Sequence, residues 1–239
     1  MHVDTPHYGE SWDTYWTATQ ERRQSSLWDV EPELACALDL PRFAEYLDRD
    51  KVLLDVGCGN GTQTRYLARH YERVMGTDAS PAAVEAATAK DPDTPYTVLD
   101  LLDAPTVDAL HARIGDANIY MRTVLHQILP EHRPAFAGAL RSLLGTTGVL
   151  AFVELAPTAE EHLHELVEEY GSPPDLTRVL STGIRPGGVD GHEAHELLGT
   201  GSFTMLAEED TVLHTNFPLP GGGRAQLPAC FAVLRHDIA

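Results

Sequence analysis

Short apolar runs alternate with stretches of helical pattern from residue 51 onward. The apolar runs are bounded by glycine, aspartate or other turn residues, which is typical of buried strands. The pattern predicts strands over residues 51–56, 73–78, 96–99, 118–121 and 149–155, and helices over 62–71, 81–90 and 131–144. Strands separated by helices form parallel sheets through right-handed crossovers, with helices on both faces. The sequence therefore predicts an α/β fold.

The C-terminal region has a different pattern. Two strand-like stretches, 203–215 and 227–236, are joined by a loop rich in proline and glycine. Because no helix lies between them, we expect them to pair as an antiparallel hairpin at the edge of the sheet. The complete sheet would then have seven strands and be mostly parallel.

Residues 1–50 are rich in aromatic and charged side chains and predict short helices over 31–38 and 41–47. The expected organisation has three parts: a helical lid or cap over 1–50, a main domain over 51–239, and a lid or substrate insertion within it at about 156–202.

The chain is strongly acidic. Its 239 residues include 36 Asp and Glu against 17 Lys and Arg, a formal charge of −19. Contacts from Lys and Arg to phosphates dominate nucleic-acid affinity, so neither nucleic acid nor an anionic membrane is an expected partner. No apolar run approaches the ~18–20 residues of a membrane span. The first residues lack the basic start and apolar core of a secretion signal, so we expect a cytoplasmic protein.

Cysteine and histidine spacings do not predict a metal centre. The three cysteines, Cys36, Cys58 and Cys230, form no CxxC pair. The run from His192 to Glu196 is one residue short of the H-E-x-x-H pattern. We expect neither a metal nor a disulfide framework.

The segment Asp55-Val56-Gly57-Cys58-Gly59-Asn60-Gly61 directly follows the first predicted strand and opens a helix. Glycines allow positive φ and let a ligand approach the backbone, while the helix start presents free N–H groups. Thr62 stands where the dinucleotide fingerprint G-x-G-x-x-G has its third glycine, which disfavours a dinucleotide.

Two further carboxylates follow the next two strands. Asp78 ends the second strand, where a carboxylate can accept both hydroxyls of a ribose. Asp100, followed by Leu101, ends the third, where it could accept from the exocyclic amine of adenine. These residues predict a ligand with a ribose and an adenine but no phosphate.

The glycine loop, Asp78 and Asp100-Leu101, in this order and spacing, resemble the class I S-adenosylmethionine-dependent methyltransferases. The resemblance covers about residues 51–155 in detail and implies a Rossmann-like fold with S-adenosylmethionine as cofactor. It implies that the glycines contact the methionine part, Asp55 the amino group, Asp78 the ribose and Asp100 the adenine. The cofactor contacts it implies are Asp55, Gly57, Gly59, Gly61, Asp78, Ala79, Asp100 and Leu101.

The stretch after the fourth strand is similar to that of the small-molecule O-methyltransferases. The resemblance implies that Arg122 contacts the cofactor, that His126 deprotonates a hydroxyl, and that Glu154 steers this base. Gln127 and Ile128 depart from the acidic and aromatic residues of that pattern. The alternative is that His126 is a loop or cofactor-side histidine without a catalytic role.

The N-terminal aromatic residues have two interpretations. Their side chains either cover the apolar face of the sheet, or Tyr15 or Trp16 belongs to a lid over the cofactor. An aromatic face would favour the cationic sulfonium by ~0.5–2 kcal/mol.

We therefore expect an enzyme that methylates a small molecule, and the favoured acceptor atom is a hydroxyl oxygen. The alternatives are N- or C-methylation, another S-adenosylmethionine-dependent or pericyclic reaction, and a protein that binds the cofactor without catalysis. The oligomeric state, monomer or homodimer, stays open.

Overall fold

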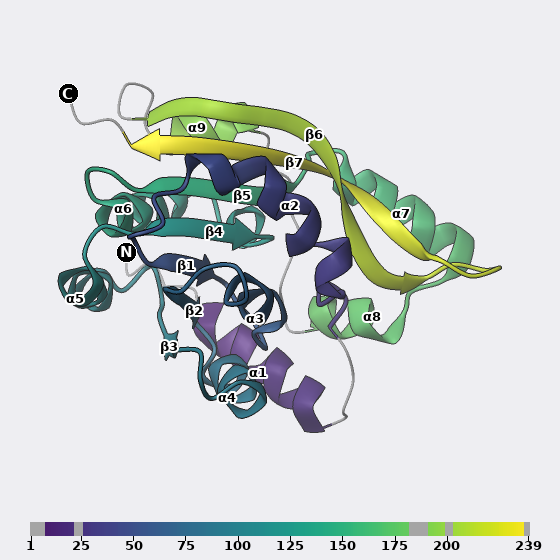
Figure 1. Ribbon diagram of the computed structural model, residues 1–239. Coiled ribbons are helices and arrows are strands. Elements are labelled where there is room, and N and C mark those ends of the chain that lie inside the picture. The colour runs from purple at the N-terminus through teal and green to yellow at the C-terminus, as the bar shows by residue number, and fades with distance from the viewer. Residues whose placement is uncertain (1–7, 22–25, 182–190, 199–202, 237–239) are drawn as a thin grey trace, which may run out of the picture.

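The computed structural model describes residues 8–21, 26–181, 191–198 and 203–236. Seven strands form one sheet in the order β3-β2-β1-β4-β5-β7-β6 (Figure 1). The strands are β1 (Leu53–Val56), β2 (Val74–Asp78), β3 (Tyr96–Val98), β4 (Asn118–Arg122), β5 (Val149–Leu155), β6 (Phe203–Pro218) and β7 (Arg224–His236). The first five are parallel, and β7 runs antiparallel to both β5 and β6. This confirms the predicted sheet and its C-terminal hairpin.

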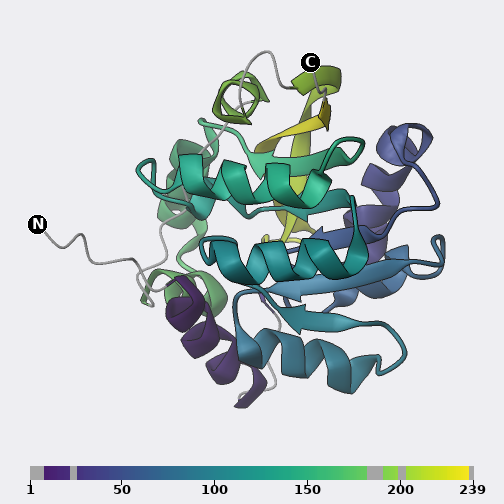
Figure 2. The same ribbon diagram turned by 90° about the vertical axis from the view of Figure 1, so that its left-hand side faces the viewer.

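Helices cover both faces of the sheet. They are α1 (Tyr8–Glu21), α2 (Cys36–Phe43), α3 (Thr62–Leu67), α4 (Pro81–Lys90), α5 (Ala104–Ile114), α6 (Arg133–Leu144), α7 (Ala159–Tyr170), α8 (Pro174–Ser181) and α9 (Gly191–Leu198). The apolar core on one face includes side chains from α5, α6 and α9, and the core on the other face includes side chains from α2, α3 and α7. Figure 2 shows α5 and α6, in teal, lying across the sheet.

The central strands carry apolar side chains on both of their faces because both faces are covered. In β4, Ile119 and Met121 point into one core and Tyr120 into the other, and all three are buried. In β5, Phe152 belongs to the first core and Val153 to the second. This two-residue alternation within a continuous apolar run is the pattern of a parallel sheet buried on both faces.

Three local predictions differ from the structure. The helix predicted over 31–38 is a short 3₁₀ turn, Pro32–Leu34, followed by α2. Pro41 lies inside α2 instead of starting a new helix, because burial of Leu40 and Phe43 against the sheet outweighs the loss of one N–H donor. The sequence pattern did not yield α5, although it supplies Val107 and Leu110 to the core.

α1 lies beside α4 at the end of the sheet where β2 and β3 lie (Figure 1). Asp13 Oδ1 accepts hydrogen bonds from Ser80 Oγ (3.0 Å) and Ala82 N (2.8 Å), so a side chain of α1 binds the N-terminus of α4. Tyr15 and Trp16 of α1 pack with Val179 of α8. α1 therefore joins the sheet domain to the region after β5. None of the helices in the described ranges is long and apolar enough to span a membrane.

Candidate active site

A cavity lies at the carboxyl ends of β1, β2 and β4 and beside the loop after β3. Open parallel sheets bind their ligands at this edge. Among the described residues that line it, four are carboxylates and one is a cation: Asp29, Asp55, Asp78, Asp100 and Arg122. Aromatic side chains form another part of the wall: Tyr8, Trp12, Trp16, Trp28 and Phe136. The described wall is thus acidic and aromatic.

The glycine loop forms the floor of the cavity. Gly57, Gly59 and Gly61 have φ of 74°, 54° and 78°, which L side chains rarely adopt. A Cβ on Gly57 would lie 2.4 Å from Val124 Cγ2, and one on Gly59 would lie 2.7 Å from Trp16 Cζ2. These two glycines therefore let the loop after β4 and helix α1 close onto the backbone.

Gly61 has a different environment from the other two glycines. A Cβ there would lie 2.7 Å from the Tyr96 hydroxyl and 3.0 Å from Ala87 Cβ. Gly61 is not among the described residues that line the cavity, and it packs tightly at the start of α3; its expected contact with the cofactor stays a prediction.

Asp78 joins the glycine loop to the start of α4. Its Oδ2 accepts from Gly59 N and its Oδ1 from Ser80 N, both at 2.9 Å. Burial raises the pKa of Asp78 above its ordinary value, and the backbone donors oppose this effect. The carboxylate is thus held rigidly in the cavity wall, where it has lone pairs to offer to hydroxyl groups.

The loop after β3 supplies the next part of the wall. Asp100, Leu101 and Leu102 all line the cavity, and Asp100 Oδ1 accepts from Leu102 N at 2.9 Å. Ala79, which follows Asp78, also lines it. These residues lie where the sequence analysis expected the adenosine part of the ligand.

Asp55 is almost fully buried at the end of β1 and still lines the cavity. Burial raises its pKa to about 7, although Thr64 Oγ1 donates to its Oδ2 at 2.6 Å. A buried carboxylate without a cationic partner among the described residues would favour a positively charged ligand group beside it.

Arg122, at the end of β4, is held from behind by Asp39. Arg122 Nε lies 3.3 Å from Asp39 Oδ2, which also accepts from the Tyr120 hydroxyl at 2.7 Å. Arg42 Nη1 lies 3.6 Å from the other oxygen of Asp39. The guanidinium of Arg122 is therefore oriented and largely neutralised before any ligand binds.

His126 and Glu154 form a buried pair outside the described cavity wall. His126 Nδ1 lies 2.7 Å from Glu154 Oε2, and Glu154 is fully buried. Glu154 Oε1 also accepts from the backbone N–H groups of Val124 (2.9 Å) and Leu125 (2.8 Å). The carboxylate thus holds the 3₁₀ turn Leu125–Gln127 against the end of β5.

The contact between His126 Nδ1 and Glu154 is the one expected of a carboxylate that orients a histidine, because it leaves the other ring nitrogen free of that bond. His126 is not among the described residues that line the cavity, and its expected role as a general base, which must reach the proton it removes, stays a prediction. Thr123, just before the turn, has a φ of 61°, which is rare for a β-branched residue. The pair also anchors this turn, because Glu154 binds both the His126 ring and the backbone N–H groups of the turn.

Tyr15 also lies outside the described wall, contrary to expectation. It is fully buried, its hydroxyl donates to Ser26 Oγ at 2.9 Å, and the Arg178 guanidinium lies 5.1 Å from its ring centre. The residues of α1 that do line the cavity are Tyr8, Trp12 and Trp16. Their spacing of four residues puts them on one face of the helix, and this periodic signal could have identified them from the sequence.

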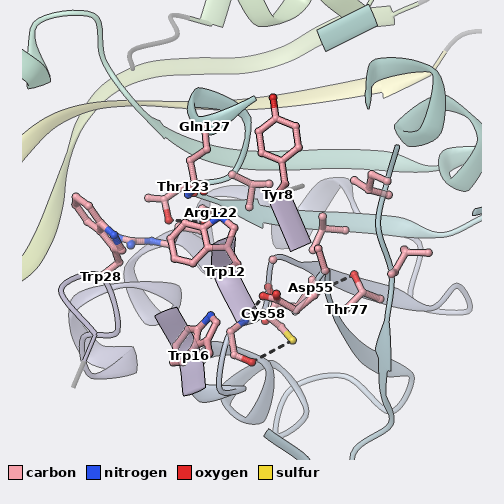
Figure 3. Close-up of a pocket in the computed structure, with 18 of the residues that line it drawn as sticks. Tyr8, Trp12, Trp16, Trp28, Asp55, Cys58, Thr77, Arg122, Thr123 and Gln127 are labelled. Atoms are coloured by element: carbon pink, nitrogen blue, oxygen red, sulfur yellow. Dashed lines mark hydrogen bonds between the residues drawn. The ribbon is translucent and has the colours of Figure 1, made fainter. Parts of the chain in front are cut away.

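Other wall residues carried no recognisable motif. They come from the segment after α1, from the glycine loop and α3, and from the loop after β4: Ser26, Trp28, Asp29, Asn60, Gln63, Thr123 and Gln127. Figure 3 shows Trp12, Trp28 and Arg122 on one side of the cavity and Asp55, Cys58 and Thr77 on the other.

Comparison with known proteins finds methyltransferases among the relatives of this chain. A family model described as a methyltransferase domain matches residues 54–152. A trans-aconitate 2-methyltransferase of Escherichia coli is 31% identical over 125 residues, 52% of this chain and 46% of its own length. An uncharacterised methyltransferase of Schizosaccharomyces pombe is 29% identical over 57% of this chain and 50% of its own. The chain thus spans about half the length of the curated relatives it matches.

A solved structure matches nearly the whole chain. The crystal structure of an S-adenosylmethionine-dependent methyltransferase from Anabaena variabilis is 36% identical, covers 98% of this chain and 96% of that one, and has a TM-score of 0.93. The chain belongs to the class I S-adenosylmethionine-dependent methyltransferases. A magnesium protoporphyrin IX methyltransferase from Synechocystis with bound S-adenosylhomocysteine shares the fold at 15% identity and a TM-score of 0.59.

The cofactor of this methyltransferase family is S-adenosylmethionine, and the residues of the cavity fit it. Gly57 and Gly59 present backbone without a side chain in the cavity wall, which a ligand can approach closely. The described wall offers carboxylates, which suit ribose hydroxyls and a cationic ligand, and only one cation, which does not suit a pyrophosphate. Asp78 would hold the ribose, Asp100 the adenine end and Asp55 the amino group.

Proposed function

We propose that this methyltransferase transfers the methyl group of S-adenosylmethionine to a hydroxyl oxygen of a small-molecule acceptor. The observation that carries the proposal is a single cavity that brings the glycine loop together with Asp55, Asp78 and Asp100. Several relatives are named as methyltransferases of trans-aconitate, which is a small molecule. Their names support a small-molecule acceptor for this chain.

When bound, the cofactor supplies an electrophilic methyl group: the acceptor oxygen forms a bond to this carbon while the carbon–sulfur bond breaks and its electron pair stays on sulfur. The residues of this chain act by binding and alignment. Asp78 and Asp100 fix the adenosine end, and the glycine loop fixes the other. Alignment of this kind can contribute ~7–11 kcal/mol to the rate enhancement.

The remaining tasks are to exclude water and to take up the acceptor proton. Trp12 and Trp16 cover the cavity from α1, and Trp28 covers it from the following segment. The described wall offers carboxylate oxygens, and the proton of the hydroxyl would pass to one of them or to water. Such a site suits a hydroxyl that is already acidic, as a phenol is.

Calorimetry with S-adenosylhomocysteine tests the cofactor site. Asp78→Asn removes a charged acceptor while keeping its shape, and a hydrogen bond to a charged group contributes about 1.5–3 kcal/mol. We expect the dissociation constant to rise about 10- to 100-fold. The control, Asp93→Ala, makes the same change of charge at an exposed position and should bind as the wild type does.

Formation of S-adenosylhomocysteine from the methyl donor in the presence of hydroxylated small molecules then tests catalysis. Absence of S-adenosylhomocysteine binding at millimolar concentration would contradict the cofactor site. Binding without turnover on any hydroxylated acceptor would contradict the proposed reaction.

A further inference from the structure

We infer that the acceptor is a flat, uncharged aromatic molecule that carries the hydroxyl to be methylated, and not a carboxylic acid. This inference rests on the proposed function and names the substrate class of the same site. Three observations carry it: the place left for the acceptor, the charges around that place, and the side chains that face it.

The strand order determines where the acceptor lies. Asp78 and Asp100 follow β2 and β3, so the adenosine part lies on that side of the cavity, and the glycine loop after β1 holds the centre. The acceptor must approach from the opposite side, over the end of β4. The wall there is formed by Thr123 and Gln127 after β4, together with Trp12 and Trp28. Figure 3 shows Trp12, Trp28 and Arg122 gathered on this side.

The charges on this side do not favour an anion. Arg122 is the one cationic side chain among the described wall residues, and Asp39 already lies 3.3 Å from its Nε. If Arg122 binds the carboxylate of the cofactor, as the family resemblance implies, it has still less to offer the acceptor. Asp29 contributes a negative charge to the same wall and accepts from Asn60 Nδ2. A carboxylate on the acceptor would lose its hydration here without gaining a cationic partner.

The shape and polarity of this side favour a ring. Two indoles, from Trp12 and Trp28, provide flat apolar surfaces on this side, Tyr8 adds a phenol elsewhere in the wall, and aromatic pairs prefer stacked or edge-to-face contacts. Trp12 is held in place by an edge contact with Tyr15, with ring centres 5.3 Å apart. Tyr8 is held by its hydroxyl, which accepts from Leu129 N at 2.9 Å. Rigid aromatic walls of this kind recognise a flat ring without requiring a charge.

The test compares probes that differ in one property and measures their binding to the protein saturated with S-adenosylhomocysteine. 2-Naphthol is flat and uncharged, 6-hydroxy-2-naphthoate adds a carboxylate, decahydro-2-naphthol removes the aromaticity, and trans-aconitate is a carboxylic acid without a ring. We expect 2-naphthol to bind about tenfold or more tightly than each of the other three.

A lysine on the acceptor side should change the charge preference. In Gln127→Lys, 6-hydroxy-2-naphthoate should gain about tenfold in affinity while 2-naphthol does not gain. The control, Gln226→Lys, makes the same substitution at an exposed position on β7 outside the cavity and should leave both affinities unchanged.

The wild-type comparison needs no variant, so it decides the inference even if Gln127→Lys does not fold. Equal or tighter binding of 6-hydroxy-2-naphthoate or trans-aconitate overturns it, and so does failure of 2-naphthol to bind at millimolar concentration. Loss of S-adenosylhomocysteine binding itself would instead refute the proposed function, so the two failures are distinguishable.

Discussion

The contact between Gly59 and Trp16 predicts how strongly helix α1 is coupled to the glycine loop. In Gly59→Ala, the new Cβ would lie 2.7 Å from Trp16 Cζ2 and 3.1 Å from Cη2. Both atoms belong to a rigid indole that is itself packed against Tyr15, with ring centres 5.7 Å apart. The ring therefore cannot move aside without disturbing α1.

Two costs add up in this variant. An alanine at a φ of 54° costs about 1–2 kcal/mol because its Cβ approaches the following carbonyl. Overpacking against the indole costs about 1–3 kcal/mol more. The free energy of unfolding should fall by about 2–5 kcal/mol in total, a large part of the ~5–15 kcal/mol of a typical domain. Part of this strain can be relieved if α1 moves away from the glycine loop and opens the cavity. If ligand binding must reverse that movement at a cost of about 1.4 kcal/mol, S-adenosylhomocysteine binds about tenfold more weakly.

Urea unfolding and calorimetry with S-adenosylhomocysteine measure the two effects. In a Trp16→Ala background the overpacking disappears, so Gly59→Ala should then cost only the backbone strain of about 1–2 kcal/mol. Gly138→Ala is the matched control: it lies within α6, the nearest heavy atom to the new Cβ is Arg141 Nη2 at 3.7 Å, and it should stabilise by about 0.5–1 kcal/mol. An equal cost of Gly59→Ala in both backgrounds would refute the coupling between α1 and the loop.

Two further predictions concern the buried carboxylates of Glu154, through its partner His126, and of Asp55. His126→Ala should lower the free energy of unfolding by about 1.5–3 kcal/mol, because the hydrogen bond to Glu154 is lost. The kcat of the folded variant should stay within a few-fold of the wild-type value. A decrease in kcat of about 10²–10⁴, as expected for the loss of a general base, would contradict a role limited to anchoring the turn. The pKa of Asp55 is raised to about 7 in the folded protein, against an ordinary pKa of 3.8. Between these two pH values the unfolded chain binds fewer protons than the folded protein. The free energy of unfolding therefore falls as pH rises through this window. The full decrease in the free energy of unfolding is about 4 kcal/mol. Urea unfolding from pH 4 to 8 should show this decrease in the wild type and not in Asp55→Asn. Parallel plots of unfolding free energy against pH for the two proteins would contradict the raised pKa of Asp55.

The sheet could be predicted from the sequence because its signals are local. Continuous apolar runs ended by glycine or aspartate identify buried parallel strands without knowledge of the partners. The same holds for the glycine loop, Asp78 and Asp100, because parallel strands bring their carboxyl ends to one edge whatever lies around them.

The parts of the site that the sequence does not determine depend on contacts between distant segments. Whether His126 faces the cavity is decided by Glu154, 28 residues away, and by the rare backbone conformation of Thr123. Which aromatic residues of α1 face the cavity depends on how α1 is rotated against α4, and Asp13 fixes that rotation through the α4 N-terminus. Neither interaction leaves a local pattern in the sequence, so the sequence alone does not place the side chains of His126 and Tyr15 relative to the cavity.

The attachment of α1 at two points has a consequence for the rate of turnover. Asp13 ties the helix to α4 on one side of the cavity, and Tyr8 ties it to the loop after β4 on the other, where its hydroxyl lies 3.2 Å from His132 Nδ1. Any movement of α1 that widens the entrance must break at least one of these hydrogen bonds, so departure of the spent cofactor is activated by local detachment of the helix. The pace of repeated cycles would then be set by two polar contacts of α1 and not by the chemical step.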